Sequence, residues 1–554
     1  MILSEMRPNA IIENASTLGF RDIDVNHDWV GDVRRRCSYL DLADTSDFIR
    51  QARELGLVND DTVSNHLMDY QTLNEKQMKV FKQIESHYSD LITNSTHHEP
   101  LRLIVMGTAG TGKSYLINMI RIRLCEIARS HDVNAESPIV VLAPTGVAAF
   151  NIRGTTIHST LSIPVSSKTF DLNGESLKKL QNRLKGISYF IIDEKSMVGR
   201  RMLAIIDIRL RQAFPEQRNQ VFGGRSLILV GDFGQLPPVL DEPMYSQIPR
   251  CDPLSSDGIV AYSQFCEVYK LDIIQRQSGD SEEQCNFRSL LLCLRNGEST
   301  EDDWKLLATR FSDSPKVLSL DRDRFLKATC IIPRRSDVDE FNMNKLASLN
   351  CPVAAINAVH TGGSEARKAD FDVAKGLQAC LLLAKGAKVM LRTNLWTEAG
   401  LVNGSVGTVE EIVFDENQGL PSLPNAVLIE FNNYSGPAVV TTEGKKLVPI
   451  IPVRHTWKGK KGPCSRLQIP ICLAWAITVH KSQGLTMQEA TIDLGKKEFA
   501  AGLSFVAISR VCALENIIFS PFSLERLQRV KTSKRLQERL VEERRLFSMI
   551  SQND

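Results

Sequence analysis

The sequence predicts an α/β protein built on open parallel sheets, and three features of its 554 residues indicate that class. An apolar stretch from residue 101 leads directly into a glycine-rich loop and a helix. Further apolar stretches follow at 138–143, 190–192 and 226–230, each ending in small or polar residues. More apolar stretches, separated by helical patterns, follow residue 271. Strands that alternate with helices form parallel sheets, whose chemistry lies at the carboxyl ends of the strands.

The composition is that of a globular protein with several domains. The chain is too long for one core, and a hydrophobic share of 43% and a charged share of 24% are ordinary for soluble proteins. A formal net charge of +2 leaves any nucleic-acid contact to a local groove. The 12 cysteines include no C-x-x-C pair, which favours reduced thiols inside a cell. Neither a membrane-spanning run nor a secretion signal is recognisable, so we expect no membrane association.

The loop from Gly107 to Ser114 carries the full phosphate-binding pattern G-x4-G-K-S. Its glycines let backbone N–H groups close around phosphates, while Lys113 neutralises charge and the Ser114 hydroxyl can ligate Mg²⁺. The helix over 115–129 directs its N-terminus at the anion. A glycine-rich turn that fits by chance is the alternative, but the strand before the loop and the helix after it argue against that. The loop predicts nucleoside triphosphate binding.

The residues before the loop are less informative. Residues 1–70 predict only a small helical lead-in. Asn74 can cap the helix that follows it. Gln77 offers the paired donor and acceptor that an adenine edge requires. The alternative is an ordinary solvated helix position, and the nearness of Gln77 to the phosphate loop favours the functional interpretation.

The second strand ends in small residues and hydroxyls, which include Asn151 and His158. Such residues let a backbone or a sugar-phosphate chain approach closely. Taken alone, this segment reads better as a turn with a helix cap, and His158 reads as a structural histidine whose hydrogen bonds are satisfied within the protein.

The third and fourth strands deliver the other half of an ATPase site. Asp193 and Glu194 follow the third strand, where Asp193 can hold a water of the Mg²⁺ shell and Glu194 can deprotonate the attacking water. Gln235 follows the fourth strand and can touch both the γ-phosphate and the water. The prolines at 237 and 238 stiffen that turn. A solvated Asp-Glu pair is the alternative, and the preceding strand favours the functional interpretation.

The second α/β region offers two arginines. Arg276 lies in the segment 271–277, and Arg510 ends the apolar helical stretch over 503–510. Both can be surface charges. In a two-lobed ATPase they would instead reach the γ-phosphate and stabilise charge in the transition state.

Short strands at 388–392, 407–414, 426–431, 438–442 and 446–453, separated by Gly, Asn and Pro, suggest a small barrel. At its rim, Trp457 stands beside three lysines within 458–461, a composition that suits single-stranded nucleic acid. A solvated hairpin tip is an equally good interpretation. From Ser523 onward, the charged tail predicts a solvated helix.

Together these motifs resemble those of superfamily-one helicases that move 5′→3′, most closely the PIF (petite integration frequency) type related to bacterial RecD. The likeness covers about 70–523, and a signature helix of that family resembles 203–224. Lys195 departs from the pattern, because an apolar residue is expected after the Asp-Glu pair. The matching segments are LNEKQ (73–77), GTAGTGKS (107–114), APTGVAAFNIRGTTIHS (143–159), IIDEKSM (191–197), VFGGRSLILVGDFGQLPPV (221–239), LDIIQRQ (271–277), GLVNGSVGTV (400–409), LAWAITVHKSQGLT (473–486) and FVAISRV (505–511).

The resemblance implies two RecA-like parallel-sheet lobes with a small β-barrel insert in the second lobe. The implied first lobe spans 71–270 and includes a strand-separating wedge at about 160–185. The second lobe spans 271–385 and 466–523, the insert spans 386–465, and a charged helix spans 524–554.

The resemblance also implies a role for each matching position. The catalytic positions are Lys113, Asp193, Glu194, Gln235, Arg276 and Arg510. The ATP-binding positions are Gln77, Gly107, Thr108, Ala109, Gly110, Thr111, Gly112, Lys113 and Ser114. Ser114 and Asp193 would hold Mg²⁺, and the DNA path would include Asn151, His158, Thr478, His480 and Lys481.

The implied activity is an ATP-dependent DNA helicase that translocates 5′→3′ on single-stranded DNA and unwinds duplexes, in replication, repair, recombination or telomere maintenance. The implied partners are single-stranded and forked DNA, and we expect a monomer. A nuclear location is implied, with a mitochondrial form as an alternative. An RNA–DNA hybrid helicase, the helicase part of a mobile element and a non-hydrolysing single-strand binder are the alternatives in function.

Overall fold

The computed structural model describes residues 18, 21–31, 48–54, 70–93, 99–131, 137–164, 171–317, 323–371, 373–414, 420, 422–441, 443–459, 462–498 and 500–550. The chain divides into two units, which are Met1–Ser64 with Arg334–Thr478 and Asn65–Pro333 with Val479–Asp554. Each unit is described separately. Every helix in the described ranges is too short or too polar to cross a bilayer.

The larger unit is organised around a parallel sheet of six strands in the order β3-β2-β4-β5-β1-β6. Val105 of β1 pairs with Val230 of β5 on one side and with Tyr269 of β6 on the other. Every residue of β4 and β5 is buried, as expected where helices cover both faces of a parallel sheet. The strands are β1 Arg102–Gly107, β2 Ile139–Ala143, β3 Thr155–Thr156, β4 Tyr189–Ile192, β5 Ser226–Gly231 and β6 Glu267–Leu271.

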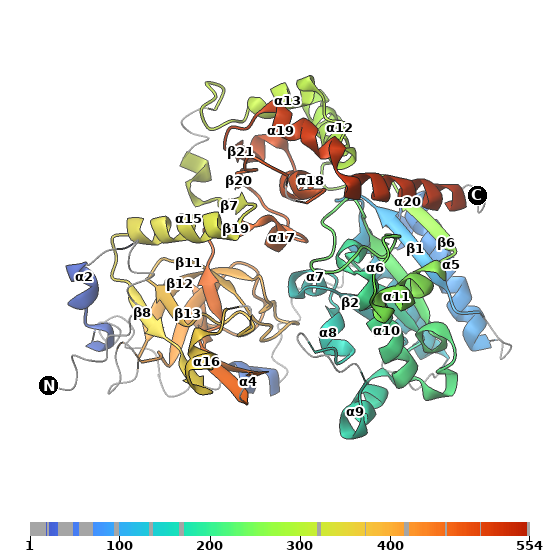
Figure 1. Ribbon diagram of the computed structural model, residues 1–554, viewed down its shortest axis with the longest axis horizontal. Helices are drawn as coiled ribbons and strands as arrows, with labels where there is room; N and C mark the ends of the chain where they lie inside the picture. Colours follow the sequence, from blue (N-terminus) through green and yellow to red (C-terminus); the bar gives the residue numbers. More distant parts are fainter. Residues whose placement is uncertain are drawn as a thin grey trace. The chain divides into compact units, whose positions relative to one another are not determined.

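Alternate residues of β1 enter two different cores, because successive side chains of a strand point to opposite faces. Leu103 and Val105 pack with α5 Glu75–Thr93 and α6 Lys113–Ser130. Ile104 and Met106 belong to the core that includes α9 Gly174–Leu184, α10 Arg200–Ala213 and α11 Pro253–Ser263. The helices at the other strand ends are α7 Gly146–Asn151 and α8 Ile157–Thr160. Figure 1 shows these layers around β1, β2 and β6.

The larger unit also holds a second parallel sheet, in which β20 Ala490–Ile492 lies between β7 Thr329–Ile332 and β21 Ile517–Phe519. The core around it takes side chains from α12 and α18, including Phe287, Leu290, Phe505 and Val506. The two RecA-like parallel sheets expected from the sequence are therefore present. The helices of this region are α12 Glu282–Asn296, α13 Glu301–Ala308, α17 Val479–Ser482, α18 Leu503–Ile508 and α19 Leu524–Gln528.

The charged tail departs from the solvated helix that its sequence predicts. Helix α20 Lys534–Ile550 buries five side chains, three of which are charged. Leu546 joins the core of the first sheet, and α20 runs beside β6, as the red helix in Figure 1 shows. The prediction was wrong because charged residues, satisfied by ion pairs, interrupt the apolar pattern that normally marks a buried face. The buried residues are Leu536, Arg539, Glu542, Glu543 and Leu546.

The smaller unit is mainly antiparallel. Its largest sheet has the order β14-β15-β13-β12-β11-β18, and its pairings run from β14 at one end to β18 at the other. Closure into a barrel therefore stays a prediction. The unit also holds the sheets β16-β17-β9 and β10-β8. Its elements are α2 Asp22–Val25, α4 Phe48–Glu54, α15 Arg335–Ser348, β8 Ala354–Asn357, β9 Val359–Thr361, α16 Gly363–Lys368, β10 Cys380–Leu383, β11 Lys388–Leu391, β12 Val406–Val413, β13 Ala426–Phe431, β14 Val439–Val440, β15 Lys446–Ile450, β16 Val453–Lys458, β17 Pro463–Gln468, β18 Ile471–Leu473 and β19 Ala476–Thr478.

One predicted strand of the insert is two strands. The stretch 446–453 breaks between Ile450 and Val453, where Pro452 has no N–H for a ladder. Trp457 lies near the end of β16 with the Arg466 guanidinium 6.0 Å from its ring centroid. Residues 460 and 461 of the predicted basic rim lie outside the described residues.

Candidate active site

The phosphate loop joins β1 to α6 as its sequence predicts. The loop wraps around the ammonium of Lys113, whose Nζ donates to the carbonyls of Gly107 and Thr108 at 2.9 and 2.8 Å. Burial lowers the pKa of Lys113, and the nearby carboxylates of Glu194 and Asp193 oppose that shift. The side chain is thus a buried cation that the loop's own carbonyls solvate.

Two glycines of the loop are required by both conformation and space. Gly110 has φ +86° and Gly112 has φ +76°, in the left-handed region that glycine adopts at no steric cost. A Cβ on Gly110 would lie 2.6 Å from Cβ of Arg276, and one on Gly112 would lie 2.5 Å from Nε2 of Gln77. The loop therefore fits between α5, which carries Gln77, and the segment 271–277, which carries Arg276.

Gln77 lies against the back of the loop. Its backbone N–H donates to Asn74 Oδ1 at 3.0 Å, while its Oε1 accepts from the Asn74 N–H at 3.1 Å. This reciprocal pair of hydrogen bonds confirms that Asn74 caps α5. The Gln77 Nε2 donates to the Thr111 carbonyl at 3.3 Å. With only 4% of its surface exposed, Gln77 is not the solvated residue offered as the alternative. Its predicted adenine contact stays a prediction.

A cavity of about 250 Å³ lies in front of the loop, within the larger unit. Residues from the first sheet, from the segment after β6 and from the C-terminal part of the chain all line it. The sequence-predicted residues that it brings together are Ala109, Gly110, Gly112, Lys113, Ser114, Asn151, Asp193, Glu194, Gln235, Arg276 and Arg510. All six predicted catalytic positions therefore lie around one cavity.

The two carboxylates are nearly buried. Asp193 is 5% exposed, and burial together with the charge of Glu194 raises the pKa of Asp193 to about 7. Glu194 is 9% exposed and has φ 52°, a left-handed conformation that costs a non-glycine residue about 1–3 kcal/mol. Strain of this kind is found at functional sites because the surrounding structure enforces it. It fixes the direction of the Glu194 side chain.

Gln483 was not among the residues expected from the sequence, yet it contacts two of the residues that line the cavity. It is 4% exposed, and its Nε2 donates to Glu194 Oε2 and to Gln235 Oε1, both at 3.1 Å. One amide therefore links the expected base to the expected γ-phosphate sensor. Its position in the polar loop after the strand ending at Thr478 was the available signal, but that loop was assigned to DNA.

Three cations face the cavity without a carboxylate partner in the described ranges. Arg276 donates to the Ser509 carbonyl at 3.2 Å, and Arg510 donates to the Val506 carbonyl at 2.7 Å. Burial lowers the pKa of both, and burial together with the charge of Arg276 lowers the pKa of Arg510 to about 9. Together with Lys113, these groups form a strongly anion-attracting site.

The expected metal ligands fit a cation in one respect. Asp193 Oδ1 is buried and has no hydrogen-bond partner among the described residues, so it can accept from a metal-bound water. Ser114 lines the same cavity. No cluster of three His, Cys, Asp or Glu side chains occurs in the described ranges, and a site made of one hydroxyl, one carboxylate and substrate oxygens is typical of Mg²⁺.

The five expected DNA-binding residues come from three segments of the chain. Asn151 lines the nucleotide cavity, where its Nδ2 donates to the Gly484 carbonyl at 2.7 Å. His158 in α8 is half-buried, as are His480 and Lys481 in α17. Thr478 ends β19 in the smaller unit.

The hydroxyls before α7 and α8 act as helix caps, as the alternative interpretation of that segment expected. Thr145 caps α7 through the Ala148 N–H, and Thr156 caps α8 through the Ser159 N–H. The expected wedge contains α9, and residues 165–170 within it lie outside the described residues.

Comparisons with known proteins agree with this site. Residues 72–305 match the PIF1-like helicase family. ATP-dependent DNA helicase Pif1 of Psychrobacter sp. (strain PRwf-1) is 30% identical over 456 residues, which cover 75% of this chain and 65% of that protein. ATP-dependent DNA helicase PIF1 of Xenopus laevis is 31% identical over 461 residues, which cover 82% and 64%. The chain thus spans slightly less than two thirds of these relatives.

A solved structure extends the likeness to the fold. The crystal structure of Pif1 helicase from Candida albicans is 27% identical and aligns with a TM-score of 0.63, covering 85% of this chain and 98% of that one. The order of the motifs, the paired parallel sheets and the shared nucleotide cavity agree with these matches. In sequence and in fold, the chain is thus similar to PIF1-like helicases.

Proposed function

We propose that the chain is an ATP-dependent DNA helicase that moves 5′→3′ on single-stranded DNA. The observation that carries the proposal is the meeting of Lys113, Glu194 and Gln235 with Arg276 and Arg510 around one cavity. The first three follow strands of one parallel sheet, and Arg510 follows a helix packed on the other. Such an arrangement lets hydrolysis depend on the spacing of the two sheets, as a motor requires. Relatives named ATP-dependent DNA helicases support the DNA substrate.

The side chains divide the chemistry of hydrolysis. Glu194 accepts a proton from the attacking water, whose position Gln235 and Gln483 fix through their shared hydrogen bond. Lys113 exchanges the loop carbonyls for phosphate oxygens, and the two arginines stabilise the charge that develops on the γ-phosphate. Ser114 and Asp193 would hold Mg²⁺, which would neutralise phosphate charge. Repeated closing and opening would then move the grip along one strand.

Measuring ATP hydrolysis with and without single-stranded DNA tests this proposal. We expect stimulation by DNA and loss of hydrolysis in Lys113→Ala, with binding to DNA retained. Forked duplexes with a 5′ or a 3′ tail then test direction, and only the 5′ tail should support unwinding. Absence of DNA stimulation, or unwinding from the 3′ tail, would contradict the proposal. We further propose that the active form is a monomer, which a linear dependence of the initial rate on protein concentration would support.

A further inference from the structure

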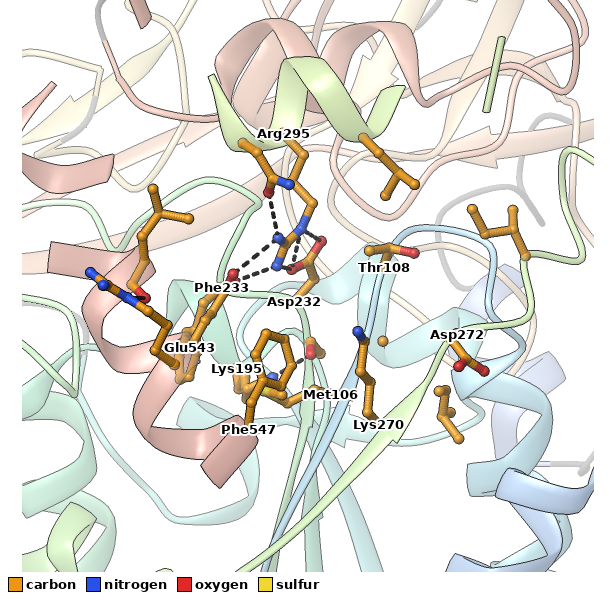
Figure 2. Close-up of a pocket in the computed structure, with 18 residues that line it drawn as sticks. Met106, Thr108, Lys195, Asp232, Phe233, Lys270, Asp272, Arg295, Glu543 and Phe547 are labelled. Atoms are coloured by element: carbon orange, nitrogen blue, oxygen red, sulfur yellow. Dashed lines mark hydrogen bonds and ion pairs between the residues drawn. The ribbon is translucent and has the colours of Figure 1, made fainter. Parts of the chain in front are cut away.

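Asp232, Arg295 and Glu543 form a buried charge cluster behind the phosphate loop, apart from the nucleotide cavity. The Asp232 side chain is 1% exposed, that of Arg295 is 12% exposed and that of Glu543 is 6% exposed. Figure 2 shows the Arg295 guanidinium directed at both carboxylates, with dashed lines to each. We refer to these three residues as the arginine cluster.

The contacts within the cluster are strong by geometry. Arg295 Nε donates to both carboxylate oxygens of Asp232 at 3.0 and 3.1 Å, and Nη1 donates to Glu543 Oε2 at 3.1 Å. Burial raises the pKa of Asp232, but the Arg295 charge outweighs it and the pKa falls to about 2. Charge-assisted pairs with this forked geometry resist displacement by water. Asp232 is therefore ionised near neutral pH.

The three residues come from different parts of the larger unit. Asp232 follows β5 of the first sheet, and Glu543 lies on α20, whose Leu546 packs into the core of that sheet. Arg295 lies on α12, whose Phe287 and Leu290 pack into the core of the second sheet. Two carboxylates from the first-sheet side thus hold one arginine from the second-sheet side.

The cluster also supports the loop that carries Gln235. Asp232 Oδ1 accepts from the Gly234 N–H at 2.8 Å, and the Asp232 carbonyl accepts from the Gln235 N–H at 3.2 Å. A Cβ on Gly234 would lie only 2.4 Å from Nε of Arg295. The turn therefore rests directly on the arginine, and the next residue, Gln235, enters the nucleotide cavity.

The space beside this connection is only partly filled. A second cavity of about 530 Å³ lies between the strand ends, α12 and α20, and its lining includes Phe233, Leu292, Arg295, Leu540 and Phe547. Figure 2 shows these elements arranged around open space. Because side chains across a void lack packing partners, the link between α12 and α20 depends on polar contacts, which include the ion pair of Arg295 with Glu543 and the hydrogen bond from Arg539 to the Arg295 carbonyl at 2.7 Å.

We propose that Arg295 is a positioning residue for ATP hydrolysis, which holds the Asp232–Gln235 turn and is itself held by Glu543 of α20. The C-terminal helix thereby sets the placement of the γ-phosphate sensor without touching the nucleotide. This inference rests on the proposed ATPase function.

The test uses Glu543→Gln in the full chain, because this change keeps the size of the side chain and removes its charge. We expect kcat for DNA-stimulated hydrolysis to fall about tenfold, since small misplacement of a catalytic group is costly. The KM for ATP should change less than about twofold, because Lys113 is unaffected. Arg295→Lys, which cannot form the forked contact, should have the same kcat effect.

Glu542→Gln is the matched control. Glu542 is the neighbouring buried carboxylate on α20, but it pairs with Arg545 and accepts from Tyr262 Oη at 2.7 Å, away from the cluster. We expect its kcat to be unchanged. An equal loss in both variants would mean that α20 acts only through general stability, and the inference would be overturned.

A double-mutant cycle with Gln235→Ala identifies the path of the effect. If Glu543 acts through Gln235, Glu543→Gln should change kcat by less than about twofold in a chain that already carries Gln235→Ala. Multiplicative losses would overturn the inference. An inactive wild-type chain would contradict the ATPase function. An active wild-type chain whose kcat is unchanged by Glu543→Gln would contradict only the positioning role.

Discussion

Replacing Gln483 by alanine should slow ATP hydrolysis while leaving nucleotide binding nearly intact. The amide has two N–H hydrogens, and its contacts with Glu194 and Gln235, both at 3.1 Å, are shorter than its third contact, with Ser196 Oγ at 3.5 Å. Alanine removes both contacts at once. Glu194, the proposed base, then loses the donor that fixes its carboxylate. Gln235, the proposed γ-phosphate sensor, loses the partner that orients its own amide toward the nucleotide.

The expected decrease in kcat can be worked out because one of the two acceptors, Glu194, is a carboxylate. A hydrogen bond to a charged group contributes about 1.5–3 kcal/mol, which corresponds to about a 10- to 100-fold change in rate if the bond persists in the transition state. We therefore expect kcat to fall about 10- to 100-fold. Gln483→Glu should lower it further, because a carboxylate would then face Glu194 at hydrogen-bond distance and the two charges repel.

Single-turnover hydrolysis with saturating ATP and DNA isolates this step from product release. The matched control is Gln83→Ala, which also removes a glutamine amide bonded to a carboxylate, that of Glu267 at 3.2 Å, but outside the cavity. We expect the control to keep the wild-type rate. A Gln483→Ala chain that hydrolyses ATP within about twofold of wild type would refute the reasoning, because the bridge would then have no role in the transition state.

Three further predictions concern single side chains. Glu194→Gln should lower single-turnover kcat by about 100- to 10,000-fold, while a fluorescent ATP analogue still binds. Lys195→Met should raise the free energy of unfolding measured in urea, because burial lowers the pKa of Lys195 from 10.5 to about 7. Such a shift corresponds to about 5 kcal/mol, of which the lost hydrogen bond to the Gly231 carbonyl offsets about 1–3 kcal/mol. The unfolded chain binds this proton more tightly, so the gain should be full below pH 7 and vanish toward pH 10.5. Burial also lowers the pKa of His480 below 6.5, so His480→Asn should reduce the loss of stability on acidification below that pH, as thermal unfolding at pH 7.5 and 5.5 would show.

Local patterns predicted the first sheet well because each signal there has one strong physical cause. A glycine-rich loop needs a strand before it and a helix after it, and Lys113, Glu194 and Gln235 all follow from strand ends that must meet at one edge. The apolar runs at β4 and β5 predict strands buried on both faces, and both strands are buried throughout. Arg276 and Arg510 were placed at the same site through the family resemblance, since nothing local distinguishes them from surface arginines.

Polar contacts between residues far apart in the chain could not be predicted from the sequence. Gln483 and Glu194 are 289 residues apart, and no periodicity relates them. Helix α20 looks solvated because Arg539 and Glu543 are charged, although their partners make burial possible. Lys195 breaks the expected apolar pattern, yet it is fully buried, with its ammonium donating to Gly231 and 4.5 Å from the Phe233 ring centroid.

The single turn of α17 has a mechanical consequence. His480 and Lys481 lie on that turn, and Gln483, which donates to Glu194, follows Ser482 directly. The Ser482 hydroxyl donates to the Val479 carbonyl at 2.8 Å and so tightens the turn. Tension on a DNA strand bound by Lys481 would be transmitted to Gln483 through one intervening residue, so little of the displacement would be lost on the way. Inserting a single glycine between Lys481 and Gln483 should therefore uncouple ATP hydrolysis from translocation, while ATP hydrolysis and DNA binding each persist.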